Sequence, residues 1–249
     1  MVNVQSRLPD SITHAVIRML DEVIERARVP PEHVIAEASK RGLSMSGPAV
    51  RDRLSSLRFC APLMLDPLAR QYVTSGCLAA GMQGFVAGLG GGRATLPLAI
   101  SADALGTLAG VVRATSGVMG AYGFETETEE GLAHLRVGLL AAAGVSMATT
   151  EGTRVLGSYL SRQLLQRAAA ERLEAALTGK LSRHLAAGAF WERLPRAVPV
   201  VGGTIGAGVN AGIVALMGAR ARAHYRGLLI EWQRNRGITP PLVWDLPQR

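Results

Sequence analysis

The feature that most constrains the fold is a run of 23 residues without a charged side chain, Ala197 to Ala219. Arginines border it on both sides, at Arg193 and Arg196 before it and at Arg220 and Arg222 after it. As one straight helix at about 1.5 Å per residue it would be roughly 35 Å long, enough to cross the apolar core of a bilayer. Its early proline, its many glycines and its internal polar side chains are unusual for a lipid-facing helix. We therefore predict a helix packed closely on other helices.

The glycines of this run are spaced so that two helix backbones can meet. Gly202 with Gly206, and Gly208 with Gly212, are pairs of small residues four positions apart. Such pairs remove side-chain bulk from one face of a helix. A second stretch, 71–92, is also rich in glycine and carries no charge. We predict that this stretch and the first, 197–219, are two long apolar helical segments that form a pair.

Composition favours helices over strands. Hydrophobic residues make up 48% of the 249 residues and aromatic residues only 4%, while glycine occurs 29 times. The alternation of apolar and polar residues that is typical of strands is almost absent. We predict an all-α fold, a multi-helix bundle. Besides the two apolar segments, helical periodicity and end signals predict helices at about 10–28, 31–41, 48–59, 101–123, 127–149 and 151–178.

Local signals mark several of these helix ends. Pro31 suits the first position of a helix and Gly42 suits the position just after its end. Gly123 closes a later helix in the same way. Thr126, followed three residues later by Glu129, has the capping-box pattern that starts the next helix. These signals are local, so they predict where helices begin and end but not how they pack.

The net charge of +8 is concentrated near the C-terminal end of the sequence. Residues 151–249 hold 14 basic and 6 acidic side chains, against 3 and 5 in residues 76–150. Arginines beside apolar helices fit an anionic membrane surface on the cytoplasmic side, although a soluble basic protein fits the same balance. Few aromatic residues and no recognition motif argue against nucleic-acid binding. The predicted membrane-surface residues are Arg193, Arg196, Arg220, Arg222 and Arg226.

No pattern in the sequence indicates catalysis, a cofactor or a metal. The glycine run 88–95 lacks both the P-loop ending and the G-x-G-x-x-G spacing. The histidines lie on separate predicted helices without a second ligand three or four residues away. Cys60 and Cys77 are interpreted as reduced thiols, and the N-terminus lacks the features of a signal peptide. We therefore expect a cytoplasmic protein that is not an enzyme.

Three segments resemble the EcsC family. The first runs from Gly92 to Leu98 and resembles that family's G-x-x-T-L-P-L segment. The second, 122–124, resembles its aromatic Y-G-[YF] motif, and the third, 198–202, resembles its [IV]-P-x-x-G segment, which is followed by an asparagine. The segments occur in the family's order and cover roughly residues 60–230. The residues that carry the resemblance are Gly92, Thr95, Leu96, Pro97, Leu98, Tyr122, Gly123, Pro199, Gly202 and Asn210.

The sequence divides into three predicted regions. Its own helical pattern and composition predict an amphipathic helical region at 1–60 and a Pro-rich tail at 237–249, and the resemblance implies an EcsC-like helical domain at 61–236. The resemblance also implies a non-catalytic accessory role. The family is named for a protein encoded beside the subunits of an ABC transporter linked to secretion, so membrane transporter subunits are the implied partners. With the charge pattern, this predicts a protein at the inner face of the cytoplasmic membrane.

A second hypothesis uses the same apolar residues differently. If the glycine-rich segments fold inward, the chain is a soluble all-α domain that binds a lipid-like or apolar small ligand between its helices. The two hypotheses differ in whether the apolar faces of 71–92 and 197–219 are buried or form an exposed patch.

We further predict that the three motif segments meet in one place. Pro97 leaves the carbonyl groups around Leu96 without helical donors, and the side chains of Asn210 and Tyr122 can supply hydrogen bonds. Gly123 removes side-chain bulk where two backbones would approach.

Overall fold

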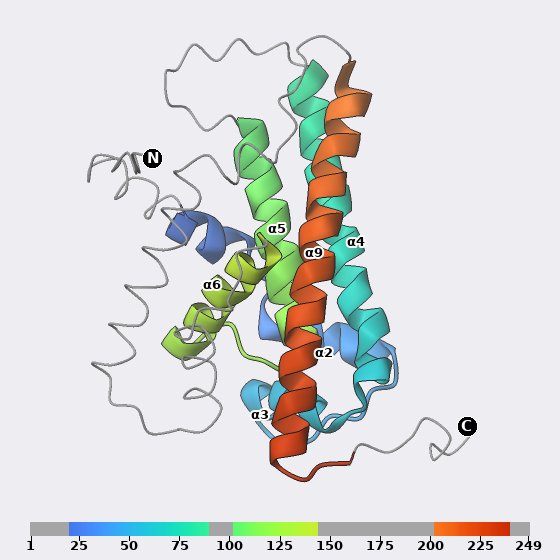
Figure 1. The fold of residues 1–249 in the computed structure, drawn as a ribbon, viewed down its shortest axis with the longest axis vertical. Coiled ribbons are helices and arrows are strands. Elements are labelled where there is room, and N and C mark those ends of the chain that lie inside the picture. The colour runs from blue at the N-terminus through green and yellow to red at the C-terminus, as the bar shows by residue number, and fades with distance from the viewer. Residues whose placement is uncertain (1–19, 90–101, 144–201, 240–249) are drawn as a thin grey trace, which may run out of the picture.

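A computed structural model of the chain describes residues 20–89, 102–143 and 202–239. These residues form helices, turns and loops, without a strand among them, so the predicted all-α class is confirmed. Three long helices make the body of the bundle: α4 (Pro62–Leu89), α5 (Ala102–Ala121) and α9 (Gly202–Asn235). Figure 1 shows α4 and α9 side by side and antiparallel along most of their length, with α5 against both. The predicted pairing of the two glycine-rich segments is therefore present within 71–89 and 202–219.

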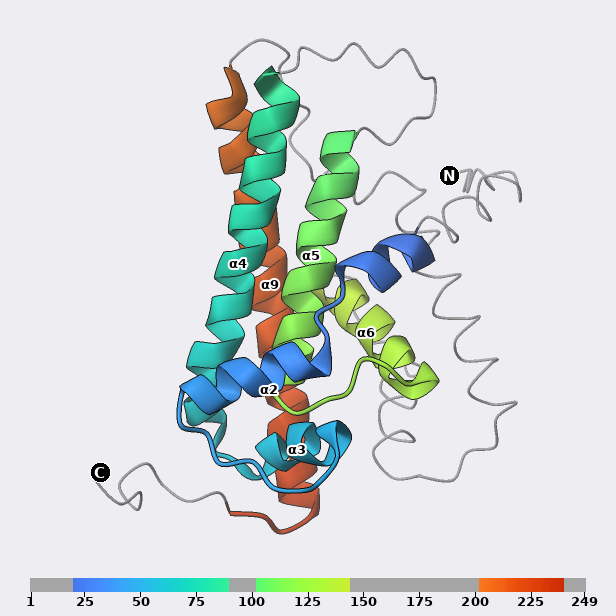
Figure 2. The ribbon, with the colours of Figure 1, turned by 180° about the vertical axis from the view of Figure 1, so that it is seen from behind.

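Shorter helices close one end of this body and one flank. Helix α6 (Glu129–Ala142) crosses α5 and α9, as both views show (Figure 1, Figure 2). Helices α2 (Pro31–Lys40) and α3 (Val50–Ser56) and the 3₁₀ turn η1 (Leu57–Phe59) cover the end of the bundle at which α9 finishes. The further predicted segments 10–19, 93–98, 144–149 and 151–178 lie outside the described residues.

The N-terminal part of the chain packs into the same core as the long helices. Leu20, Ile24 and Val34 are buried in one cluster with side chains of α4, α5 and α9. The backbone N–H of Val29 donates to the buried hydroxyl of Ser116 on α5 at 3.0 Å. These contacts anchor residues 20–60 on the bundle.

Helix α2 forms where its local signals predict. Pro31 occupies the first position, where its missing N–H costs no helical hydrogen bond. The side chains of Val34, Ile35 and Ala38 follow at helical spacing and are buried. Gly42 has φ of 72°, a left-handed conformation that suits the residue after a helix.

Several helix boundaries differ from the predictions: α5 ends at Ala121 and α6 at Ala142, before the predicted 123 and 149. Helix α4 begins at Pro62, well before Gln71, because the charge-free run marks composition and not the helix start. The expected helix at 48–59 is two elements, α3 and η1. Helix α6 is capped by Thr128 instead of Thr126: the Thr128 hydroxyl accepts the Gly131 N–H at 3.0 Å. Both threonines precede glutamates, and the capping-box pattern alone did not separate them.

The glycines at helix contacts are mostly not the ones predicted. A Cβ added to Gly76 on α4 would lie 2.9 Å from the carbonyl oxygen of Gly110 on α5, so these backbones approach closely. By contrast, Gly208 and Gly212 are exposed, with open space where a Cβ would be. The predicted close packing through this pair is wrong, because it lies on the outer face of α9. The packing around Gly202 and Gly206 lies outside the part of the chain that the structure describes.

Within the described ranges, no helix combines the length and the apolar character that a bilayer crossing requires. Helix α9 is 34 residues long, but its second half carries Arg220, Arg222 and Arg226. Of the charge-free run 197–219, α9 contains residues 202–219, and residues 197–201 lie outside the described part of the chain.

Candidate functional site

Charge is absent from one half of the α4–α9 pair. Residues 71–89 of α4 and 202–219 of α9 contain no charged side chain, and the two segments lie against each other at the upper end in Figure 1. Gly218 contacts Val73, and Val214 contacts Gly76, which fixes this antiparallel register. We call these two segments the charge-free half.

Large apolar side chains are exposed on the charge-free half. On α4, Leu78 is 65% exposed and Met82, one turn later, is 71% exposed. On α9, Leu216 is 55% exposed. Exposed side chains of this size are informative when several occur on one part of a surface. Leu78 and Met82 are four residues apart and share one face of α4, and Leu216 is exposed on the neighbouring helix α9.

Arginines lie where the charge-free half ends. Arg70 and Arg220 are exposed, and Arg222 is half-buried. Arg220 donates to the carbonyl of Ala142 at 3.4 Å, which holds its base near α6. Of the other predicted membrane-surface residues, Arg226 pairs with Asp66 within the protein at 3.4 Å, and Arg193 and Arg196 lie outside the described residues.

The Tyr122 motif residue forms a buried polar contact. Its hydroxyl donates to the Asp66 carboxylate of α4 at 2.6 Å, and that carboxylate also faces Arg226 of α9. Burial, and then the neighbouring Asp66, raise the pKa of Tyr122. The expectation that Tyr122 donates to carbonyls near Leu96 is wrong, because its single O–H is used by Asp66.

The remaining motif residues are placed in part. Gly123 has φ of 81° and lies just after α5, where Phe124 N–H bonds back to the carbonyl of Met119 at 3.1 Å. Asn210 is buried on α9 and has a polar partner. Gly202 is the first residue of α9. The others, Gly92, Thr95, Leu96, Pro97, Leu98 and Pro199, lie outside the described residues, so the predicted meeting of the three segments stays a prediction.

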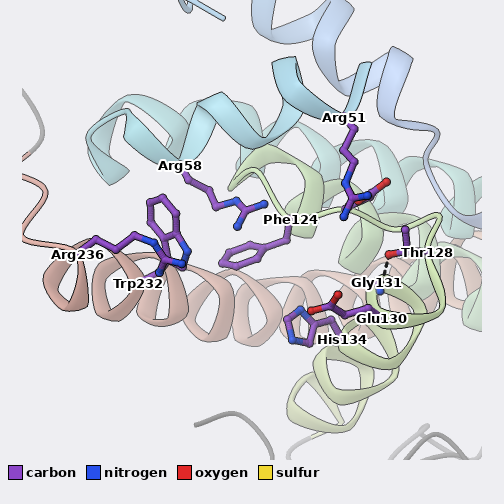
Figure 3. Close-up of a pocket in the computed structure, with 10 residues that line it drawn as sticks. Arg51, Arg58, Phe124, Thr128, Glu130, Gly131, His134, Trp232 and Arg236 are labelled. Carbon is purple, nitrogen blue, oxygen red and sulfur yellow. Dashed lines mark hydrogen bonds and ion pairs between the residues drawn. The ribbon is translucent and has the colours of Figure 1, made fainter. Parts of the chain in front are cut away.

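A pocket of about 470 Å³ opens at the other end of the bundle, between η1, the start of α6 and the last turns of α9 (Figure 3). Side chains from four separate parts of the chain line it. Most of them are charged or polar, and two are aromatic. The lining residues are Arg51, Arg58, Phe124, Glu125, Thr128, Glu130, Gly131, His134, Trp232 and Arg236.

Arg58 is central to this pocket. Its Nε donates to the carbonyl oxygen of Gly123 at 2.9 Å. Its guanidinium carbon lies 5.5 Å from the ring centre of Phe124 and 5.3 Å from that of Trp232, within cation–π range of both. Figure 3 shows the Arg58 side chain reaching between these two rings. Burial, and then the nearby Arg236, lower the pKa of Arg58.

The pocket's other ionisable groups divide between two sides. Arg236 lies over Trp232 with 4.4 Å between its guanidinium carbon and the ring centre. On the opposite side Arg51 forms an ion pair with Glu125 at 2.9 Å. Burial, followed by His224 and Arg58, lowers the pKa of His134 to about 4, so that imidazole is neutral at pH 7.

Sequence reasoning missed this pocket. Arg51, Arg58, Trp232 and Arg236 belong to no motif, and the first two are more than 170 positions away from the last two in the sequence. The only available signal was Phe124, which follows the Tyr122–Gly123 pair. Within the described ranges, no three His, Cys, Asp or Glu side chains are grouped so that they could hold a metal ion.

The fold and its surfaces define an all-α bundle with a charge-free half at one end and an arginine- and aromatic-lined pocket at the other. Comparison with models of known protein families, with curated proteins and with solved structures finds no match for this chain. The class of the protein therefore rests on its own residues and geometry.

Proposed function

We propose that this chain is a non-catalytic accessory protein that binds reversibly to the anionic inner surface of the cytoplasmic membrane. The observation that carries the proposal is the charge-free half of α4 and α9, with Leu78, Met82 and Leu216 exposed on it. A membrane interface accepts such side chains because it removes them from water without requiring the helix to cross the bilayer.

The energies involved suit a peripheral contact. Complete burial of one leucine or methionine is worth about 1.5–3 kcal/mol. A basic residue near an anionic surface adds about 1 kcal/mol, and Arg70 and Arg220 are exposed at the base of the charge-free half. Partial burial of three side chains with a few arginines gives binding that is measurable, reversible and dependent on salt.

Membrane transporter subunits are the proposed protein partners. This part of the proposal rests on the resemblance of the Gly92–Leu98, Tyr122–Gly123 and Pro199–Gly202 segments to the EcsC family. Co-purification of an ABC transporter with the tagged full chain from gently solubilised membranes would support it. Recovery of the chain in the membrane fraction without a transporter would restrict the proposal to lipid binding.

The alternative of an apolar ligand between the helices has less support. The two glycine-rich segments do pack on each other, as that hypothesis requires, but their outer faces carry exposed apolar side chains. The pocket around Arg58 is lined by more charged than apolar side chains, so it does not favour a lipid-like ligand.

Vesicle flotation tests the membrane proposal. The full chain is mixed at low salt with vesicles of phosphatidylcholine and phosphatidylglycerol, and we expect it to float with the lipid. The double variant Leu78→Ser, Met82→Ser should bind roughly 30-fold more weakly, for a loss of about 2 kcal/mol. The matched control is Leu63→Ser, because Leu63 is 62% exposed on the same helix but lies outside the charge-free half.

Two results would decide against the proposal. Wild-type protein that stays in the bottom fraction at low salt with anionic vesicles would exclude membrane binding. Equal flotation of the Leu78, Met82 double variant and wild type would exclude the charge-free half as the contact.

A further inference from the structure

The arginine-lined pocket carries an inference that does not depend on membrane binding. Arg58 is half-buried, yet no carboxylate of the described residues forms an ion pair with it. Among the described residues, the one hydrogen bond of its guanidinium is from Nε to the carbonyl of Gly123. The two terminal nitrogens of its guanidinium keep their donors for another acceptor. A cation placed in such surroundings is more stable when an anion is beside it.

The neighbouring charges add to this positive field. Arg236 is exposed beside the same Trp232 ring and repels Arg58. Glu125 is engaged by Arg51 at 2.9 Å, and Glu130 is exposed at the start of α6. His134 is neutral at pH 7, so it adds no charge to the pocket. The described lining side chains include three arginines and two glutamates, which gives the pocket a net positive charge. The two arginines without an ion pair to a described carboxylate, Arg58 and Arg236, both lie beside the Trp232 ring.

We propose that this pocket binds the oxyanion, phosphate or carboxylate, of a small molecule through Arg58 and Arg236. Guanidinium groups match such oxyanions because they donate paired hydrogen bonds in a plane. Phe124 and Trp232 hold Arg58 between them and provide an apolar wall. A volume of about 470 Å³ exceeds that of the oxyanion alone and lies in the range of small-molecule sites, so the ligand has a body attached to the anionic group.

Calorimetric titration of the full chain at low ionic strength tests the proposal, with sodium chloride of equal ionic strength as the blank. The probes are inorganic phosphate, glycerol 3-phosphate and malonate. We expect saturable binding of at least one probe. Arg236→Gln should weaken it about tenfold or more, the effect of losing one charge-assisted hydrogen bond.

The variants separate binding from folding. Arg236 is exposed on the last turn of the bundle, so its replacement should leave the melting temperature nearly unchanged. Arg58→Gln should weaken binding as well, although it also loses the contact with Gly123. The matched control is Arg234→Gln, an exposed arginine close by on α9 that does not line the pocket. It should bind like wild type.

The same variants distinguish the source of the anion. If Arg236→Gln binds neither the soluble probes nor the vesicles, the ligand is a lipid headgroup. If this variant no longer binds the soluble probes but floats with vesicles like wild type, the ligand is a soluble metabolite. No saturable binding of any probe, or equal binding by wild type, Arg58→Gln and Arg236→Gln, would overturn the proposal. The two results that would overturn the anion proposal leave the test of the charge-free half unaffected, because that test uses the Leu78, Met82 double variant.

Discussion

His134, a half-buried residue whose Nε2 atom is enclosed by the protein, shows how one side chain makes stability depend on pH. Its ring lies 6.3 Å from that of Phe124, and its carbonyl accepts the hydroxyl of Tyr225 at 2.9 Å, which ties α6 to α9. Burial disfavours the charged imidazolium, and His224 and Arg58 add repulsion. The folded state therefore holds this imidazole neutral at pH values where an unfolded chain would protonate it.

We predict that His134→Gln makes the protein less sensitive to acid. The pKa of His134 is about 4 in the folded state against 6.5 for an ordinary histidine. As the pH falls from 7 to 4, His134 binds a proton in the unfolded state but remains mostly neutral in the folded state. The free energy of unfolding therefore decreases over this pH range. The maximum loss is about 3 kcal/mol.

Urea unfolding of wild type and His134→Gln between pH 7.5 and 4 measures this effect. Carboxylates titrate alike in both proteins, so the difference between the two curves isolates His134. The variant starts less stable through lost packing, and the gap should narrow by about 2–3 kcal/mol toward pH 4. A gap that stays constant over this range would show that His134 is not a buried neutral group.

At the scale of the element, turn geometry places the residues around the pocket. Helix α5 ends at Ala121, and the positive φ of Gly123, two residues later, turns the chain so that Phe124 is buried beside Arg58. A few residues later Thr128 starts α6 by accepting the Gly131 N–H. The short connection between these two helix ends thus positions Phe124 and Glu125 on one side of the pocket.

We predict that Thr128→Ala destabilises the protein by about 1 kcal/mol, because α6 loses its only side-chain cap. Thr128→Ser should restore most of this, since serine keeps the hydroxyl. Glu127→Gln serves as the control, because Glu127 is exposed and should change stability little. Chemical denaturation of the four proteins gives the comparison. A Thr128→Ala variant as stable as wild type would contradict the assigned cap.

For the whole molecule, the last turns of α9 contact a segment that is distant in sequence, residues 58–60. Gln233 is buried and its amide donates to the carbonyls of Arg58 at 2.7 Å and of Cys60 at 2.9 Å. The Trp232 ring meets Phe59 edge to face, 5.5 Å between centres. These contacts connect residues more than 170 positions apart and assemble the pocket.

We predict that Gln233→Leu destabilises the whole fold by about 1–3 kcal/mol, because two backbone carbonyls lose their donor. For a chain of this size the melting temperature should fall by roughly 2–4 °C per kcal/mol. Asn235→Leu is the control, because Asn235 is exposed two positions later on the same helix. Equal melting temperatures for wild type and Gln233→Leu would show that these hydrogen bonds do not hold α9 to η1.

Predictions from local signals agree best with the structure. The all-α class, the helix between Pro31 and Gly42 and the turn at Gly123 just after α5 depend on residues only a few positions apart. The charge-free character of 71–89 and 202–219 was also readable, because it is a property of composition. Resemblance to the EcsC family, the membrane role and the division into regions remain predictions.

Features that depend on packing were not readable. Glycine spacing predicted a helix contact through Gly208 and Gly212, but that pair lies on the outer face of α9. The close approach of two helix backbones is instead between Gly76 of α4 and Gly110 of α5. Sequence spacing gives the faces of a helix and does not say which face meets a neighbour. The pocket is the clearest case, because Arg58 and Trp232 are more than 170 positions apart in the sequence. Only the antiparallel packing of α4 and α9 carries Trp232 back to η1, and no local pattern encodes that approach.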